Sequence, residues 1–148
     1  MSKIMIAATL AMLSTLSGPE GRVSSECPAG LQEALIAGRF SGGPVCSGEE
    51  STFILSGTTR SGYTVYDYRY RVMAAAVMHG GQRILIFKDS DYVGQYSLSP
   101  PPYSTLSVTD SRVVVETPGS PSEEAVLVFS NGPPLQVFID GHVLDLYR

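Results

Sequence analysis

The sequence predicts a mainly β protein, an antiparallel sandwich or small barrel with one short helix near its N-terminus. Apolar and polar residues alternate along the chain from residue 52 onward, and turn-forming residues interrupt this alternation at short intervals. The composition agrees, since 15 Gly and 10 Pro among 148 residues favour many turns and few long helices. The intervals leave no room for crossover helices, which excludes a parallel α/β sheet.

The beginning of the chain has the pattern of a secretory signal. Lys3 precedes an almost entirely apolar run over 4–16, and small residues follow. We expect cleavage after Ser17, or alternatively after Ser25, which gives a signal peptide at 1–17. The run is shorter than the roughly 20 apolar residues of a membrane span, although a retained anchor or a core helix is the alternative interpretation. The expected location is therefore periplasmic or secreted, with no membrane span after signal removal.

One domain is expected after the signal, because a chain of this length has room for a single core. Residues 18–51 would supply a helix and a disulfide-linked loop, and residues 52–148 the antiparallel β body. The two parts are expected to fold together.

Two cysteines, Cys27 and Cys46, lie near the start of the exported part. An exported chain with a single pair usually joins it, so we predict a structural disulfide worth about 3 kcal/mol. The segment 28–38 between them predicts a short helix with Leu31 and Leu35 on one face. A redox or metal pair is the alternative, but there is no C-x-x-C spacing and no further sulfur ligand.

The β body divides into nine candidate strands separated by Gly, Pro, Asn and Asp clusters. In order they are 52–58, 63–78, 83–88, 92–98, 105–109, 112–116, 125–129, 135–139 and 142–147.

Two hairpins can be assigned a register from their turns. Asp140-Gly141 suits a two-residue turn with positive φ, which pairs Ile139 with His142. The predicted core face of this hairpin is the one that carries Ile139 rather than Phe138. A second hairpin is predicted at the Gly-Gly pair 80–81.

This second hairpin would pair Ala76 with Leu85 and Ala74 with Phe87, placing small residues opposite large ones. Residues 73–78 also have good helix propensity, which is the alternative interpretation of that segment.

The segment 63–72 is the most unusual part of the chain. As a strand it places Tyr66, Tyr68 and Tyr70 on one face, and Tyr96 alternates likewise on a nearby strand. The functional interpretation is a binding wall, because tyrosine rings stack on ligands and their hydroxyls form hydrogen bonds. The structural interpretation is an aromatic core face, which the same alternation would produce.

The opposite face of this strand carries Arg69 and Arg71, together with Asp67. Guanidinium groups at alternate positions could hold a carboxylate or phosphate ligand in bidentate fashion. An ion-paired solvent face is the simpler interpretation.

No catalytic constellation, metal site or cofactor site is predicted. His79 and His142 each adjoin a predicted turn, and the sequence contains no G-x-S-x-G elbow, phosphate-binding loop or calcium loop. Lys and Arg together number 10 against 14 Asp and Glu, so the basic footprint of a nucleic-acid-binding protein is absent.

The leading functional hypothesis is a small exported, non-catalytic β-domain that binds a glycan, peptide or protein partner. One alternative is an inhibitor or immunity-type protein, whose acidic surface would steer it toward a basic exported enzyme. The other alternative is a small hydrolase that uses a single histidine and a turn carboxylate.

Overall fold

The structure is a computed structural model that describes residues 23–24, 27–42, 51–119 and 121–148. The predicted signal peptide and Cys46 lie outside these residues. The elements are β1 (Val23–Ser24), α1 (Leu31–Ala37), β2 (Ser51–Thr58), β3 (Tyr63–Ala74), β4 (Val77–Lys88), β5 (Asp91–Leu98), β6 (Thr105–Thr109), β7 (Arg112–Thr117), β8 (Glu123–Val128), β9 (Gln136–Ile139) and β10 (His142–Asp145). The chain is therefore mainly β with one short helix, as predicted.

The strands form three antiparallel sheets in which each strand pairs with its neighbour in the sequence. One sheet has five strands in the order β1-β2-β3-β4-β5, one has the three strands β6-β7-β8, and β9 pairs with β10. A further bridge joins Gln95 of β5 to Tyr147 near the end of the chain. Within the described residues β1 and β5 remain separate edges of the large sheet, so the predicted alternative of a closed barrel is wrong.

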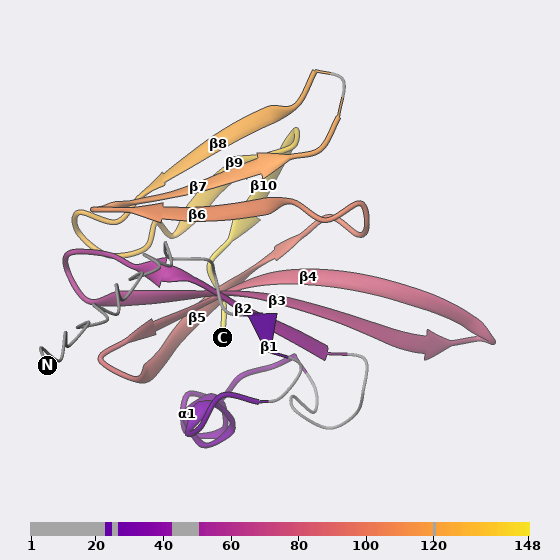
Figure 1. The fold of residues 1–148 in the computed structure, drawn as a ribbon, viewed down its shortest axis with the longest axis horizontal. Coiled ribbons are helices and arrows are strands. Elements are labelled where there is room, and N and C mark those ends of the chain that lie inside the picture. Colours follow the sequence, from indigo (N-terminus) through magenta and orange to yellow (C-terminus); the bar gives the residue numbers. More distant parts are fainter. Residues whose placement is uncertain (1–22, 25–26, 43–50, 120) are drawn as a thin grey trace, which may run out of the picture.

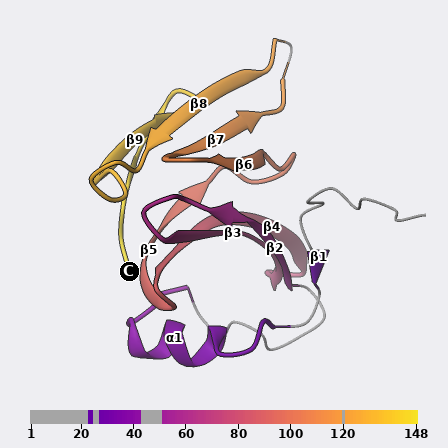
Figure 2. The same ribbon diagram turned by 60° about the vertical axis from the view of Figure 1, so that its left-hand side comes forward.

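The large sheet is covered on both faces. Figures 1 and 2 show β6–β8 and the β9–β10 hairpin over one face, and α1 against the other. Buried side chains form an inter-sheet core and a helix-side core on these two faces. The inter-sheet core contains Val65, Ile84, Ile86, Tyr96, Leu98, Val113, Val115, Leu127, Phe129 and Ile139. The helix-side core contains Leu31, Leu35, Phe53, Tyr68, Leu85, Phe87 and Tyr92.

Strand β4 contributes to both cores because successive side chains of a strand point to opposite faces. Ile84 and Ile86 enter the inter-sheet core, whereas Leu85 and Phe87 enter the helix-side core. This is why residues 84–87 of β4 form a continuous apolar run without alternation, which is typical of a strand that is buried on both sides.

The β9–β10 hairpin confirms the predicted turn and register. Asp140 and Gly141 have φ values of 51° and 73°, and Ile139 pairs with His142. Ile139 is buried in the inter-sheet core, while Phe138 on the other face is exposed. The core face is therefore the predicted one.

The predicted hairpin at the Gly-Gly pair 80–81 is wrong. The chain reverses at Ala75 and Ala76, whose φ values are 48° and 61°, and Ala74 pairs with Val77. Leu85 consequently pairs with Tyr66 rather than with Ala76. The predicted strand 63–78 is thus two strands joined by a two-residue turn.

The two glycines lie inside β4 because neighbouring side chains approach its backbone closely. A Cβ atom on Gly81 would lie 2.2 Å from Cζ of Tyr70, and one on Gly80 would lie 2.7 Å from Cγ of Pro101. Glycine in a strand commonly marks such a close approach, so the residues that suggested a turn serve side-chain packing instead.

Strands β3 and β4 extend beyond their neighbours as a two-stranded arm. The last β2 partner of β3 in this direction is Tyr70, which pairs with Ser51, and the last β5 partner of β4 is Gln82, which pairs with Leu98. Residues 71–80 lie beyond these pairs and are called the arm below. Figure 1 shows it projecting from one side of the molecule.

Candidate binding site

The tyrosine face of β3 lies toward α1. Tyr68 is 3% exposed, and its ring stacks on Phe53 at 4.8 Å and on Tyr70 at 5.2 Å between centroids. Burial raises the pKa of the Tyr68 hydroxyl. Tyr68 is therefore part of the helix-side core, while Tyr66 and Tyr70 pack at its margin and are half-buried.

A groove opens beside Tyr66, between the start of α1 and the large sheet. Its volume is about 290 Å³, and we call it the Tyr66 groove. The rings of Tyr66 and Phe87 meet edge to face at 5.7 Å on the sheet side. The lining residues are Pro28, Ala29, Gly30, Leu31 and Ala34 on the helix side, and Thr64, Tyr66, Phe87 and Ser90 on the sheet side.

Tyr70 is held in a different setting, next to Arg83. The Arg83 guanidinium lies 5.2 Å from the Tyr70 ring and 5.7 Å from the Phe40 ring, in cation–π geometry. Arg83 Nη1 also donates to Gln95 Oε1 at 2.9 Å. Phe40 was not among the predicted site residues, whereas the observed β3–β4 pairing places Arg83 opposite Tyr68.

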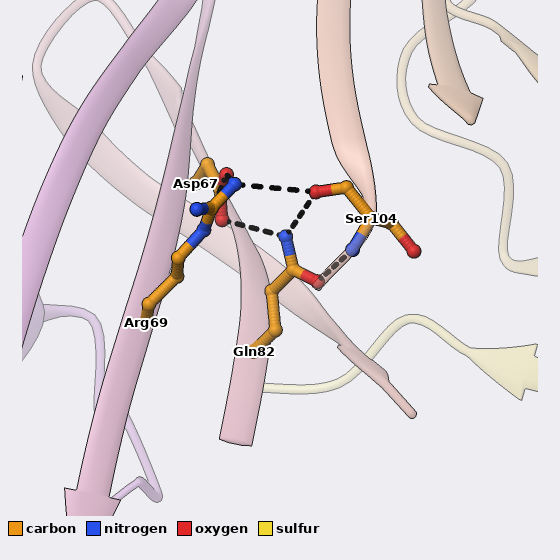
Figure 3. Close-up of polar contacts among 4 residues, drawn as sticks. All are labelled: Asp67, Arg69, Gln82 and Ser104. Atoms are coloured by element: carbon orange, nitrogen blue, oxygen red, sulfur yellow. Dashed lines mark hydrogen bonds and ion pairs between the residues drawn. The ribbon is translucent and has the colours of Figure 1, made fainter. Parts of the chain in front are cut away.

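The opposite face of β3 holds a buried polar network (Figure 3). Arg69 donates to Asp67 Oδ2 from Nη2 at 2.8 Å and from Nε at 3.1 Å. Gln82 Nε2 donates to Asp67 Oδ1 and to the Ser104 carbonyl oxygen, both at 2.8 Å. Gln82 Oε1 accepts from the Ser104 amide at 2.8 Å. Arg69 is therefore committed to an internal partner.

Asp67 is only 2% exposed, and burial raises the pKa of its carboxyl group. The hydrogen bonds from Gln82 and Arg69 and the charge of Arg69 act in the opposite direction and reduce this rise. The network connects β3, β4 and the segment before β6, so its structural contribution is to hold Ser104 against the large sheet.

The remaining predicted site residues lie elsewhere. Arg71 is exposed on the arm. Tyr96 is fully buried in the inter-sheet core, where its hydroxyl donates to the Pro134 carbonyl and burial raises its pKa. The predicted residues therefore occupy separate surroundings, and Tyr66 lines the groove described above.

The histidines also lie in separate places. His79 is exposed on the arm, whereas His142 lines a cavity of about 230 Å³ together with Asp140 and Ser99. The Ser99 hydroxyl donates to Asp140 Oδ2 at 3.4 Å. This cavity brings the histidine of the hydrolase hypothesis close to a turn carboxylate and a serine.

Comparisons with protein-family models, curated proteins and solved structures find no match to this chain. In the part of the chain that the structure describes, no helix is long and apolar enough to cross a membrane. Within the same residues, no three His, Cys, Asp or Glu side chains are grouped as they would be to hold a metal ion.

Proposed function

We propose that this chain is an exported, non-catalytic β-sandwich domain that binds an extended peptide segment of a partner protein. The observation that carries the proposal is the Tyr66 groove, a concave site beside two aromatic rings whose lining exposes both polar and apolar atoms. In this proposal an apolar side chain of the peptide inserts against Tyr66 and Phe87 and acts as the anchor of the interface.

The lining of the groove favours a peptide over a glycan. Among the described residues that line it, the only side-chain hydrogen-bonding groups are the hydroxyls of Thr64, Tyr66 and Ser90. A sugar ring carries several hydroxyls, and each one that is buried without a partner costs free energy. An apolar peptide side chain needs no such partners, and the hydroxyls remain for the adjoining peptide backbone.

The predicted disulfide has a place in this proposal. Cys27 directly precedes the helix-side wall of the groove and packs beside the helix-side core. A Cys27–Cys46 bridge would restrain this wall in the binding-competent position, which lowers the entropy cost of holding a peptide.

The test is selection of peptides from a phage-displayed random library on the mature protein, followed by calorimetry with the selected peptides. We expect Tyr66→Ala to weaken binding at least about tenfold, which corresponds to 1.4 kcal/mol, while Tyr66→Phe retains most of it. Tyr147→Ala removes a partly exposed ring elsewhere and is the matched control.

A second variant distinguishes loss of binding from loss of folding. Ala29 is exposed at the groove, so Ala29→Arg should block the site without disturbing a core. Undiminished peptide binding to both Ala29→Arg and Tyr66→Ala would overturn the proposal. Tyr66-dependent binding on a glycan array, without enrichment of any peptide, would reject the peptide class.

The His142 cavity supports a second candidate, a small hydrolase in which His142 acts as the base near Asp140 and Ser99. The purified protein would then hydrolyse a simple activated ester such as 4-nitrophenyl acetate, and His142→Ala would abolish this while His79→Ala would not. Equal rates for the wild type and His142→Ala would eliminate this candidate.

A further inference from the structure

The arm exposes apolar side chains on both of its faces. Val72 and Val77 lie on one face, at 49% and 57% exposure, and the paired residues Met73 and Met78 lie on the other, at 65% and 45%. A soluble protein seldom leaves so contiguous an apolar surface uncovered, and two strands alone are marginally stable in water. The arm therefore has the character of an interface.

Within the residues that the structure describes, the arm also presents unpaired strand edges. Among the described residues, no strand continues β2 alongside 71–74 or β5 alongside 77–81. The outward backbone groups there need hydrogen-bonding partners if they become buried. A lipid phase offers no such partners, whereas a protein surface does, so the geometry favours a protein as the occupant.

A complementary surface exists at the far end of the same chain. A hollow of about 280 Å³, here called the C-terminal hollow, lies between the start of β8 and the β9–β10 turn. Phe138, at 68% exposure, provides its apolar part. Glu123, Glu124 and Asp140 provide carboxylates, and none of the described residues that line it is Lys or Arg.

The charges of the arm and the C-terminal hollow are opposite. Residues 71–80 contain Arg71 and His79 but no Asp or Glu. Arg71 is exposed, and its guanidinium group has no hydrogen bond or ion pair among the described residues that would compete with a partner. The arm is thus apolar with a cationic group, and the hollow is apolar with anionic groups, which is the complementarity expected of two docking surfaces.

We propose that a second copy of this chain occupies the arm: two chains form a dimer in which each arm docks at the C-terminal hollow of the other. Figure 1 shows the arm and the β7–β8 end, which contributes to the hollow, extending toward the same side of the molecule. A two-fold axis on that side brings each arm to the partner's hollow, so both contacts form at once and the assembly closes.

This inference goes beyond the proposed function and is independent of it, because none of the described residues that line the Tyr66 groove belongs to the arm or to the C-terminal hollow. Dimer formation and peptide binding can each be present or absent without the other.

The test is sedimentation equilibrium of the mature protein, with charge reversal across the proposed contact. We expect a dimer for the wild type, and weakening of at least about tenfold for Arg71→Glu and for a Glu123→Arg/Glu124→Arg variant. Combining Arg71→Glu with the two glutamate reversals should restore dimerisation, which a folding defect would not do. Arg112→Glu, a reversal at an exposed arginine at the other end of β7, is the matched control.

Met73→Ser with Met78→Ser removes the apolar contact and should also leave a monomer. Two outcomes would overturn the inference. One is a wild-type protein that stays monomeric up to roughly millimolar concentration. The other is a dimer that the arm and hollow variants leave equally stable.

Discussion

Gly38 ends α1 at a point where Tyr92 leaves no room for a side chain. Its φ is −81°, so it does not provide the left-handed conformation that often ends a helix; Arg39, with φ of 61°, does so one residue later. A Cβ atom on Gly38 would lie 2.6 Å from Cδ1 and 2.8 Å from Cβ of Tyr92. The glycine is required by packing between the helix and β5.

We therefore expect Gly38→Ala to lower the free energy of unfolding by about 1–3 kcal/mol, as overpacked sites do. The Tyr92 Cβ is fixed to the backbone and cannot rotate away from the new methyl group. Urea unfolding measures the change, and Ala37→Ser, at the exposed preceding residue, is the control. An unchanged unfolding midpoint would show that α1 is not packed as closely as described.

A second prediction concerns how stability depends on pH, and its sign follows from the direction of the pKa shift of Asp67. Because burial raises the pKa of Asp67 in the folded state, the folded protein binds this proton more tightly than the unfolded chain does. The stability contributed by the protonated group is complete below its ordinary value of 3.8 and is lost as the pH rises through the folded-state pKa.

Asp67→Asn cannot ionise and should lack this dependence. We expect its free energy of unfolding, relative to the wild type, to rise as the pH increases from below 3.8 toward neutrality. Urea unfolding of both proteins across this range isolates the effect, because the other titrating groups are shared. A relative change in the opposite direction would mean that the Arg69 ion pair outweighs burial.

Part of these residue environments could be predicted from the sequence. Alternation placed Tyr68 and Arg69 on opposite faces of β3 but did not reveal what covers each face. Asp67 stands two residues before Arg69, on the same face, so their pairing was accessible. The contacts to Gln82 and Ser104 were not, because they depend on the β3–β4 register that the Gly-Gly pair misplaced.

The β3–β4 turn forms at residues whose types do not predict a turn. Two alanines adopt positive φ in a two-residue hairpin turn, where Asn and Gly are the preferred residues. Non-glycine residues cost roughly 1 kcal/mol or more in this conformation. The stronger turn signal at Gly80-Gly81 was outweighed by the long paired ribbon and by the ring of Tyr70 against Gly81.

This turn is therefore a place where the protein can be stabilised. We expect Ala75→Asn with Ala76→Gly to raise the free energy of unfolding by about 1 kcal/mol, since both residues tolerate positive φ. The matched variant Gly80→Asn should instead destabilise, because its side chain would collide with Pro101. Thermal unfolding of both variants distinguishes the observed turn from the one predicted at 80–81. A turn at 80–81 would make Gly80→Asn stabilising and the replacement of the two alanines destabilising.

Most elements were nevertheless predictable. Outside β1, β3 and β4, the alternation located the strands to within two residues, and the helix with buried Leu31 and Leu35 is confirmed. Leu135 shows the limit of such patterns, because alternation from Ile139 places it on the predicted core face of the last hairpin, yet it is 78% exposed. It lies just before β9, outside the paired strand.

For the whole molecule, the sequence predicted the class but not the division into three sheets. Short-range alternation shows which residues of a strand share a face, whereas the pairing of sheets depends on contacts between distant segments. The two cores illustrate this, since neighbouring residues of β4 belong to different ones.

Export and the disulfide are predictions at this scale. We expect the exported protein to begin at residue 18 and to contain no free thiol, and we expect Cys27→Ser with Cys46→Ser to lose about 3 kcal/mol of stability. Intact-mass measurement after alkylation, with and without reduction, checks the first two points. Alkylation of both cysteines in native exported material would refute the bridge.

The sheet topology bears on the speed of folding. Every described pair of adjacent strands is consecutive in the sequence. A strand leaving a ribosome or a translocation pore therefore finds its partner strand already synthesised, and within the described residues the bridge from Gln95 to Tyr147 is the long-range exception. Loop closure is correspondingly cheap in entropy, so we expect faster folding than is usual for an all-β chain of this size.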